Sequence, residues 1–533
     1  MNALQNILEN AINNIKGTFN APMLPDTITE NGMRAHSSTG NPLLDFFTQS
    51  VRDCEEPIFL GMLRKCMETD PKSTLAMLLH LRDPRGGKGE KLLSIYACLW
   101  LRTYKPRTYL LNLPVMIEHG CFKDILKIVE LCNERKVEKL GENNWVELEY
   151  FAEILKKDCE TFIQQEKPTL TLSGKWAPTE NTHFDHKKAG RQAKVLACIL
   201  FPDSKTRMKE YRKMLGNLRE NLRVVERLMC QNRWDEIKFG NVPSKAHRLL
   251  RNAFGKKQEE RYKEYLSNLS KGKEKINVSG TEPHDLVKNY FNDEELDGTI
   301  EGQWNELMKK LKESGNLSNS LAVVDVSGSM LGIPILVSIS LGIVVSELST
   351  GIFKNKCITF SQKPKLHDIK GSSLFERVNS VKNMEWGMNT DLMAVFDLIL
   401  EKGKETSDMI ETLYIFTDMQ FDTVDISKST SWENQSNWDR QQSNWTWADT
   451  YQTICNKYEN CGFKVPKIVF WNLRATDPAF PTTKDTPGVA LVSGFSPNLL
   501  KVFMELGELN PEIVLQKTLE PYMDLVKLHP LEC

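Results

Sequence analysis

Residues 320–330 read SLAVVDVSGSM and join two kinds of sequence. Residues 320–326 form a continuous apolar run, which is typical of a β-strand buried on both faces of a sheet. After the short polar turn, residues 333–348 (IPILVSISLGIVVSEL) have the length and composition of a buried helix. A buried strand that leads directly into a helix predicts the start of an α/β domain.

The alternation of strands and helices continues to about residue 510. The sequence predicts further strands at 356–360, 412–417, 467–471 and 489–492, and a helix at 390–401. This order indicates a doubly wound, mostly parallel sheet, which we expect over residues 316–510. Ligands of such sheets bind beyond the carboxyl ends of the strands.

The apolar stretch 331–348 has a second interpretation as a membrane span. It is only 18 residues long and contains Pro334, Ser338 and Ser340, whereas a spanning helix needs about 20 apolar residues. A buried helix of a folded domain is therefore favoured, and no membrane partner is expected.

The preceding part of the chain has a helical pattern. Between residues 45 and 310, apolar residues recur at spacings of three and four, as in Leu75, Leu78 and Leu79. Short connectors separate the helices and predict a repeat-like α-helical array, although no clean sequence period is present. Residues 1–44 are predicted to be a flexible arm without a signal peptide, and residues 511–533 a C-terminal helix. The expected fold class is α + α/β.

Composition narrows the classes of protein. The chain has 533 residues, 40% of them hydrophobic, with 69 basic and 70 acidic side chains, which excludes a wholly disordered or collagen-like chain. The twelve cysteines include no C-x-x-C pair. We therefore expect reduced thiols in the cytoplasm or nucleus.

Oxygen-bearing side chains gather at the predicted strand ends. Asp325, Ser327 and Ser329 follow the first strand, Thr390 precedes a helix, and Asp418 follows the strand at 412–417. These five groups can meet at one edge of a parallel sheet, and oxygen ligands suit Mg²⁺ or Mn²⁺. Asp391 could replace or supplement a ligand. In the alternative interpretation, Asp325 caps the helix and the serines only fill a turn.

The pattern D-x-S-x-S with a later Thr and Asp resembles the metal-ion-dependent adhesion site of von Willebrand factor A domains. Other segments resemble a family of unknown function from plants, fungi and large DNA viruses that carries this domain at its C-terminus. In the α/β half these segments are KCITF (356–360), EWGMNTDL (385–392), IVFWNL (468–473) and VALVSGFS (489–496). In the helical half they are LRDPRGGKGEK (81–91), GCFKDI (120–125), KWAP (175–178) and VPSKA (242–246).

This resemblance covers about residues 45–510 and implies the architecture and the metal site, because the family has no settled activity. Its viral members leave a virion location open. A more distant resemblance is to Ro ribonucleoproteins, which join helical repeats to a von Willebrand A domain and bind RNA. For this chain, RNA binding is an expectation by analogy.

The charge distribution gives that expectation a physical basis. Residues 204–275 hold 20 Lys or Arg against 9 Asp or Glu. Arg212, Arg219, Arg223 and Arg227 lie in a predicted helix, and the last three would share one face and could follow phosphates. Alternatively, these arginines pair with Glu220 and Glu226 on a solvated surface.

Three further segments have less specific patterns. Residues 83–90 (DPRGGKGE) lack the phosphate-loop signature, so a helix-connecting turn is favoured, although Arg82, Arg85 and Lys88 could contact an anion. His183 and His186 have a metal-ligand spacing without further ligands nearby in the sequence. Residues 425–449 form a Ser-, Asn- and Gln-rich insert with four tryptophans, which either pack on their own domain or contact a partner.

The sequence thus favours a non-enzymatic scaffold that binds an acidic group of a partner protein through the metal ion. A Ro-like RNA-binding protein is the alternative. A metal-dependent hydrolase is disfavoured, because no base or positioned water can be assigned.

Overall fold

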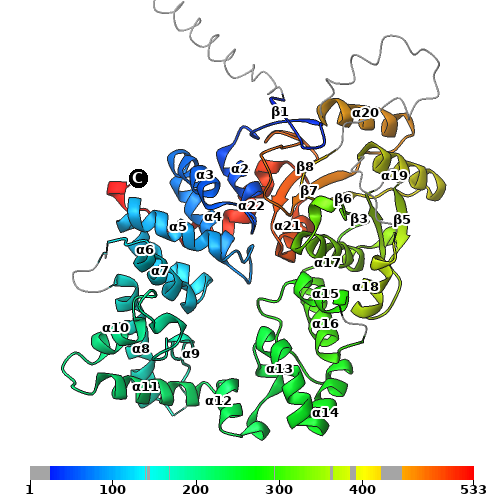
Figure 1. Ribbon diagram of the computed structural model, residues 1–533. Coiled ribbons are helices and arrows are strands. Elements are labelled where there is room, and N and C mark those ends of the chain that lie inside the picture. The colour runs from blue at the N-terminus through cyan, green and yellow to red at the C-terminus, as the bar shows by residue number, and fades with distance from the viewer. Residues whose placement is uncertain are drawn as a thin grey trace, which may run out of the picture.

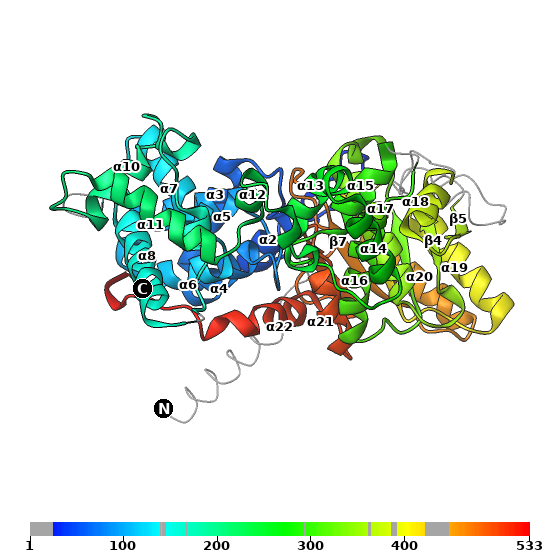
Figure 2. The same cartoon turned by 90° about the horizontal axis from the view of Figure 1, so that it is seen from below.

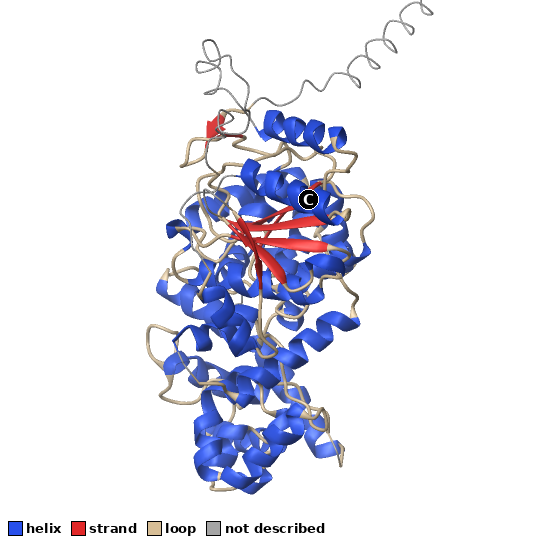
Figure 3. Ribbon diagram, turned by 90° about the vertical axis from the view of Figure 1, so that its right-hand side faces the viewer, coloured by secondary structure: helices blue, strands red, loops and turns tan. Residues whose placement is uncertain are grey.

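The computed structural model describes residues 25–138, 140, 145–166, 168–292, 295–360, 364–384, 392–421 and 447–532. An array of helices leads into a six-stranded sheet with helices on both sides (Figures 1 and 3). The predicted α + α/β fold is therefore confirmed. The first 24 residues, Thr390, Asp391 and residues 422–446 of the insert region lie outside the described residues.

The array begins at α2 and ends at α16. Several of its helices begin with proline behind a polar cap: Asp70, before Pro71, accepts a hydrogen bond from the Ser73 amide at 3.0 Å, which satisfies one free N–H of the first turn. The helices are α2 (Pro42–Gln49), α3 (Glu56–Thr69), α4 (Pro71–Arg82), α5 (Leu92–Tyr104), α6 (Pro106–His119), α7 (Phe122–Glu134), α8 (Val146–Gln164), α9 (Ser173–Trp176), α10 (Gln192–Leu200), α11 (Arg207–Asn221), α12 (Val225–Cys230), α13 (Ser244–Lys257), α14 (Glu259–Ser270), α15 (Pro283–Asn292) and α16 (Gly298–Glu313).

The sheet has the strand order β5-β4-β3-β6-β7-β8, and only β5 runs antiparallel to its neighbour. Its strands are β3 (Ser320–Val324), β4 (Lys356–Thr359), β5 (Lys365–Asp368), β6 (Thr412–Thr417), β7 (Lys467–Asn472) and β8 (Val489–Ser493). The helices that follow are α17 (Ile333–Leu348), α18 (Leu374–Lys382), α19 (Leu392–Thr406), α20 (Trp447–Asn460), α21 (Leu500–Glu505) and α22 (Pro511–Met523). The sequence predicts all of these strands except β5.

Helix α17 explains the long apolar stretch. It packs on β3 and on α15, and all of its residues from Val337 to Ser346 are buried. A helix enclosed on several sides needs apolar residues all round. Among the described helices, none is long and apolar enough to cross a membrane.

The described part of the predicted arm lies on the sheet domain. Thr29 donates a hydrogen bond to the Phe421 carbonyl at 2.7 Å, and Asn31 donates to the Gln420 carbonyl at 2.7 Å. Two short strands, β1 (Thr27–Ile28) and β2 (Arg34–Ala35), pair within this segment, and His36 bridges to Phe480. Residues 25–41 therefore have fixed contacts, which the polar composition of the segment does not reveal.

The array contacts the sheet domain at both of its ends. At its beginning α2 packs on β8, and at its end α15 packs on α17 (Figure 2). Helix α22 returns from the sheet to α4, and the Glu532 carboxylate accepts hydrogen bonds from the Arg107 and Thr108 amides at the start of α6. The two halves therefore share an extended interface.

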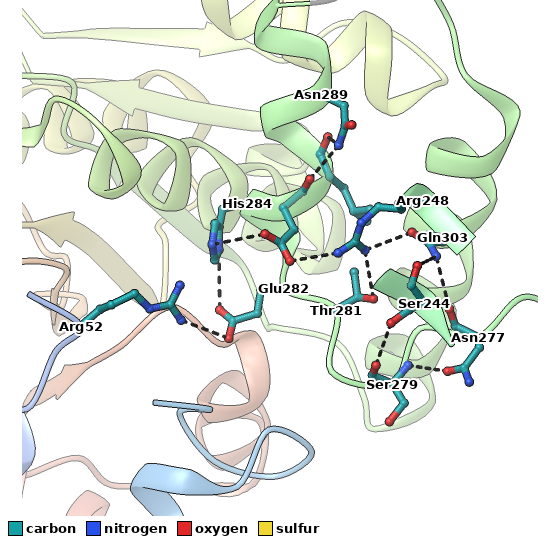
Figure 4. A network of polar contacts seen from close by, with 12 residues as sticks. Arg52, Ser244, Arg248, Asn277, Ser279, Thr281, Glu282, His284, Asn289 and Gln303 are labelled. Carbon is teal, nitrogen blue, oxygen red and sulfur yellow. Dashed lines mark hydrogen bonds and ion pairs between the residues drawn. The ribbon is translucent and has the colours of Figure 1, made fainter. Parts of the chain in front are cut away.

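A network of charged and polar groups joins the two ends of the array directly (Figure 4). Arg52, which follows α2, lies 3.2 Å from Glu90 and 3.7 Å from Glu282, just before α15. His284 lies 3.6 Å from Glu282, and Arg248 of α13 pairs with Asp285 at 3.0 Å. This network links Arg52 and Glu90, near the beginning of the array, with α13 and the start of α15 near its end.

Lys88 is a buried residue that hydrogen-bonds both to the array and to the sheet. Its side chain is fully enclosed, and its ammonium donates to the Phe47 carbonyl, to the Ser50 carbonyl at 3.3 Å and to the Ser493 hydroxyl of β8 at 2.7 Å. The predicted anion contact at this residue is therefore wrong, because the side chain points into the interface.

We expect Lys88→Met to lower the free energy of unfolding by about 1–3 kcal/mol, because it leaves buried acceptors without a donor.

Burial also lowers the pKa of Lys88 to about 7. The unfolded chain then binds more protons than the native one between about pH 7 and 10, so the stability of the wild type rises with pH in this window. Urea unfolding at several pH values should show this rise in the wild type and not in Lys88→Met. The exposed control Lys256→Met should stay within about 0.5 kcal/mol of the wild type.

Candidate metal centre

Two aspartates meet where neighbouring parallel strands end. Val324 of β3 pairs with Phe416 of β6, and the Asp325 amide donates to the Phe416 carbonyl at 3.1 Å. Asp325 follows β3 directly, and Asp418 follows β6 directly. The register of this strand pair therefore brings both carboxylates to the carboxyl edge of the sheet, as the sequence predicts.

The Asp325 side chain is fully buried and held by hydrogen bonds. Its Oδ1 accepts from the Ser327 amide at 3.0 Å, and its Oδ2 accepts from the Thr417 hydroxyl at 2.8 Å. Sequence reasoning missed Thr417. Its position as the last residue of β6, next to Asp418, was the available signal.

The two serines lie in the turn between β3 and α17. The Ser327 and Ser329 hydroxyls are 3.0 Å apart, and Gly328 between them is exposed and would accept a side chain without a clash. Gly332 has a φ of +100°, a backbone conformation that glycine adopts without strain. The turn therefore directs both hydroxyls to one place beside Asp325.

Asp418 is the least satisfied group of the site. It is 1% exposed, and its Oδ1 accepts only from the Gln420 amide at 3.2 Å. Its Oδ2 is buried and has no hydrogen-bond partner among the described residues. Burial and, second, the charge of Asp418 raise the pKa of Asp325 to about 6. Two buried carboxylates thus lie close together.

The nearest cation that contacts this turn does not neutralise the pair. Arg474, after β7, donates to the Ser329 carbonyl and lies 3.8 Å from Asp53, which belongs to the loop after α2. In the described ranges no lysine or arginine forms an ion pair with Asp325 or Asp418. The donor set of carboxylates and hydroxyls fits a hard divalent cation, which would also satisfy the orphaned Asp418 oxygen. Thr390, the fifth predicted ligand, lies outside the described residues.

The arginine stripe predicted in the basic segment is wrong as a helical face. Helix α11 ends at Asn221, Arg223 has a φ of +47°, and Arg227 belongs to α12. Arg219 donates to the Gly174 and Ala177 carbonyls, at 2.9 and 2.8 Å. The remaining three pair with acids: Arg212 with Glu180 at 2.7 Å, Arg223 with Glu236 at 3.1 Å and Arg227 with Glu220 at 2.8 Å.

The other predicted anion contacts also have internal partners. Arg82 pairs with Asp124 at 2.7 Å, and Arg85 donates to the Glu118 carbonyl at 2.9 Å. These bonds hold the connector between α4 and α5 against α6 and α7. This agrees with the interpretation of residues 83–90 as a helix-connecting turn.

His183 and His186 acquire a third potential ligand that the sequence could not reveal. Glu130 of α7 lies 3.2 Å from His183, and the ligand atoms of the three residues lie within 4.8 Å of one another. However, Lys127 already pairs with Glu130 at 2.7 Å, and His186 Nδ1 accepts from the Ala189 amide. Glu130 and His186 therefore already have partners within the chain, and we assign no metal to this triad.

Comparisons with known proteins match both halves of the chain. The domain of unknown function DUF2828 matches residues 29–149 and 147–317, and the domain of unknown function DUF7788 matches residues 319–524. An uncharacterized protein of Acanthamoeba polyphaga mimivirus is 34% identical over 529 residues, which are 93% of this chain and 88% of that protein.

The chain is also similar to the crystal structure of the Deinococcus radiodurans RO (RSR) protein, with 13% identity and a TM-score of 0.31, over 91% of this chain and 93% of that one. The first DUF match spans the array, and the second begins just before β3. By these matches, the chain belongs to the family defined by the domain of unknown function DUF2828.

Proposed function

We propose that the chain is a non-enzymatic binding protein whose Asp325, Ser327, Ser329 and Asp418 hold Mg²⁺ or Mn²⁺, with Thr390 as the expected fifth ligand. An acidic group of a partner protein would complete the coordination shell. The observation that carries this proposal is the buried Asp418 oxygen that has no hydrogen-bond partner among the described residues, beside the second buried carboxylate of Asp325.

The argument is electrostatic. Taking two carboxylates out of water is costly unless an opposite charge compensates them, and no described basic side chain pairs with either one. A divalent cation offsets both charges, and neutral hydroxyl ligands leave the ion able to accept another anionic ligand.

The rim of the site is suited to protein contact. Leu331 is 74% exposed and Ile333 is 43% exposed, and both follow the serine turn. A partner that offers a carboxylate with apolar residues beside it would match this combination. Hydrolysis would need an additional base, since the two aspartates hold the ion, and we therefore propose binding rather than catalysis.

The free cysteines fit a reducing compartment. The described cysteines, among them the buried Cys54, Cys66 and Cys132, form no disulfide. We propose the cytoplasm, the nucleus or, given the viral relative, a virion as the location.

Titration calorimetry tests the ion site. We expect the wild type to bind Mg²⁺ or Mn²⁺, and Asp418→Asn to lose this binding while remaining folded, because the amide keeps the shape but not the charge. The matched control is Asp477→Asn, an exposed aspartate after β7, which should bind as the wild type does. Equal affinity of Asp418→Asn and the wild type would refute the site.

The pH dependence of the metal-free protein gives an independent test. The native pKa of Asp325 is raised to about 6, so the native state holds a proton that the unfolded chain has already released. Stability should therefore fall as pH rises from about 4 to 6 in chelator, by up to about 3 kcal/mol. Asp325→Asn should lack this fall and be more stable than the wild type at pH 7. Denaturant unfolding in EDTA measures both effects.

Partner binding needs its own experiment. Immobilised wild type and Asp477→Asn should retain the same protein from an extract in Mg²⁺ and release it in EDTA, whereas Asp418→Asn should not retain it. Retention that is indifferent to both EDTA and Asp418→Asn would show that the partner does not use the ion.

A further inference from the structure

A cluster of lysines lies in the helical array, away from the metal centre. Trp176 of α9 has two ammonium groups over its ring: Lys123 Nζ is 4.4 Å and Lys175 Nζ is 5.1 Å from the ring centroid. The cluster also includes Lys91 and Lys245, whose charges, with that of Lys175, act on Lys123. Helices α7 and α9 belong to the first part of the array (α2–α12), whereas α13, which carries Lys245, belongs to its second part (α13–α16) (Figure 1).

Three of the four lysines of the cluster lack an acidic partner among the described residues. Within the described ranges, no ion pair involves Lys123, Lys175 or Lys245. Lys91 is 3.9 Å from Asp124, but Arg82 holds that carboxylate at 2.7 Å. Burial, and then the neighbouring lysine charges, lower the pKa of Lys123. Asp124 already faces Arg82, so the positive charges of the cluster exceed the negative charge beside them, which favours an anion from outside the chain.

Helix ends add to this positive potential. Lys91 is the N-cap of α5, Lys123 is the second residue of α7, and Lys245 is the second residue of α13. The start of a helix carries partial positive charge and free N–H groups, so cations are unfavourable there and anions are bound. The N-caps of α5 and α13 make no side-chain capping bond.

Four sequence motifs that the metal centre does not use meet at this cluster. LRDPRGGKGEK (81–91) contributes Lys91, GCFKDI (120–125) contributes Lys123, KWAP (175–178) contributes Lys175 and Trp176, and VPSKA (242–246) contributes Lys245. A cavity of about 290 Å³ is lined by Lys175 and, from the segment before Lys245, by Val242 and Pro243, and also by Lys238 and the ion pair of Arg223 with Glu236. The cavity therefore brings Lys175 and the start of α13 to one hollow.

We propose that Lys91, Lys123, Lys175 and Lys245 form a binding site for the phosphate groups of a polyphosphate anion, either an RNA strand or a small polyphosphate. Trp176 positions two of the ammonium groups by cation–π contact. The site spans the two halves of the array, so a bound polyanion joins them. It is independent of the ion at Asp325 and Asp418.

Fluorescence anisotropy with a short single-stranded RNA tests the proposal, with inorganic tripolyphosphate as a competitor and, by calorimetry, as a ligand of its own. The variant replaces the four lysines by Gln. The matched control replaces four exposed lysines of the basic segment 204–275 by Gln and thus removes the same net charge. These lysines are Lys256, Lys257, Lys271 and Lys273.

We expect the wild type and the control to bind in EDTA as well as in Mg²⁺. If each lysine contacts one phosphate of a single strand, the variant should lose about 3 from the slope of log affinity against log salt, at about 0.7 per contact. Binding of tripolyphosphate without RNA identifies a small ligand as the source, and binding of RNA identifies a strand. Both results support the phosphate site if the variant abolishes them.

Three results would overturn it. The first is a wild type that binds neither probe at about 50 mM salt, the second is a control that loses as much affinity as the variant, and the third concerns a variant with arginines. Because Gln substitution could disturb the array, Lys123→Arg with Lys175→Arg provides a second variant that keeps the charge and should keep the binding. Near-UV circular dichroism checks that each variant is folded. Loss of binding in the folded Arg variant equal to that of the Gln variant would contradict a charge-based site.

Discussion

The parallel pairing of β3 with β6 is the constraint from which the candidate site follows. Because Val324 pairs with Phe416 in parallel strands, Asp325 and Asp418 lie at the same edge of the sheet. Both strands are buried, and both carboxylates are shielded from water. Their oxygens therefore depend on hydrogen bonds from neighbouring groups. Thr417 and the Ser327 amide satisfy Asp325, while one oxygen of Asp418 has no partner in the part of the chain that the structure describes.

The segments around this edge come from distant parts of the chain. Asn31 binds the loop after Asp418 through the Gln420 carbonyl, and Asp53 accepts from the Ala475 amide at 2.9 Å. The N-terminal half thereby supports the loops of the candidate metal centre in addition to carrying its own lysine cluster. The acidic edge and the basic cluster are chemically opposite surfaces, so one molecule can hold a cation and an anion without competition between them.

Sequence reasoning recovered the features that depend on local order. The strand at 412–417 and the helix at 333–348 have the predicted bounds, because unbroken apolar runs between polar turns leave few alternatives. Asp325 and Asp418 were found because a parallel sheet collects strand ends at one edge. The short edge strand β5 was missed, because its sequence KLHD is polar and half-exposed and gives no apolar run.

The rest could not be read from sequence, because it depends on contacts between distant segments. Arg219, Arg223 and Arg227 have helical spacing, yet the helix stops at Asn221, where no proline or glycine marks its end. The basic count of residues 204–275 pointed to phosphate binding there, whereas three of the four lysines of the proposed phosphate site, Lys91, Lys123 and Lys175, lie outside this segment. Only the tertiary structure shows which basic side chains already have acids beside them.

The attachment of both ends of the array to the sheet domain has a consequence for folding. Helix α2 emerges early in synthesis, but its partner strand β8 comes late: the Ser493 hydroxyl that binds the Phe47 carbonyl is 446 residues away in sequence. Bringing such segments together costs loop-closure entropy and is slow. The part of α2 that packs on β8 therefore lacks its partner on the nascent chain until nearly the whole protein has been made. Apolar surface that is exposed for such an interval favours aggregation.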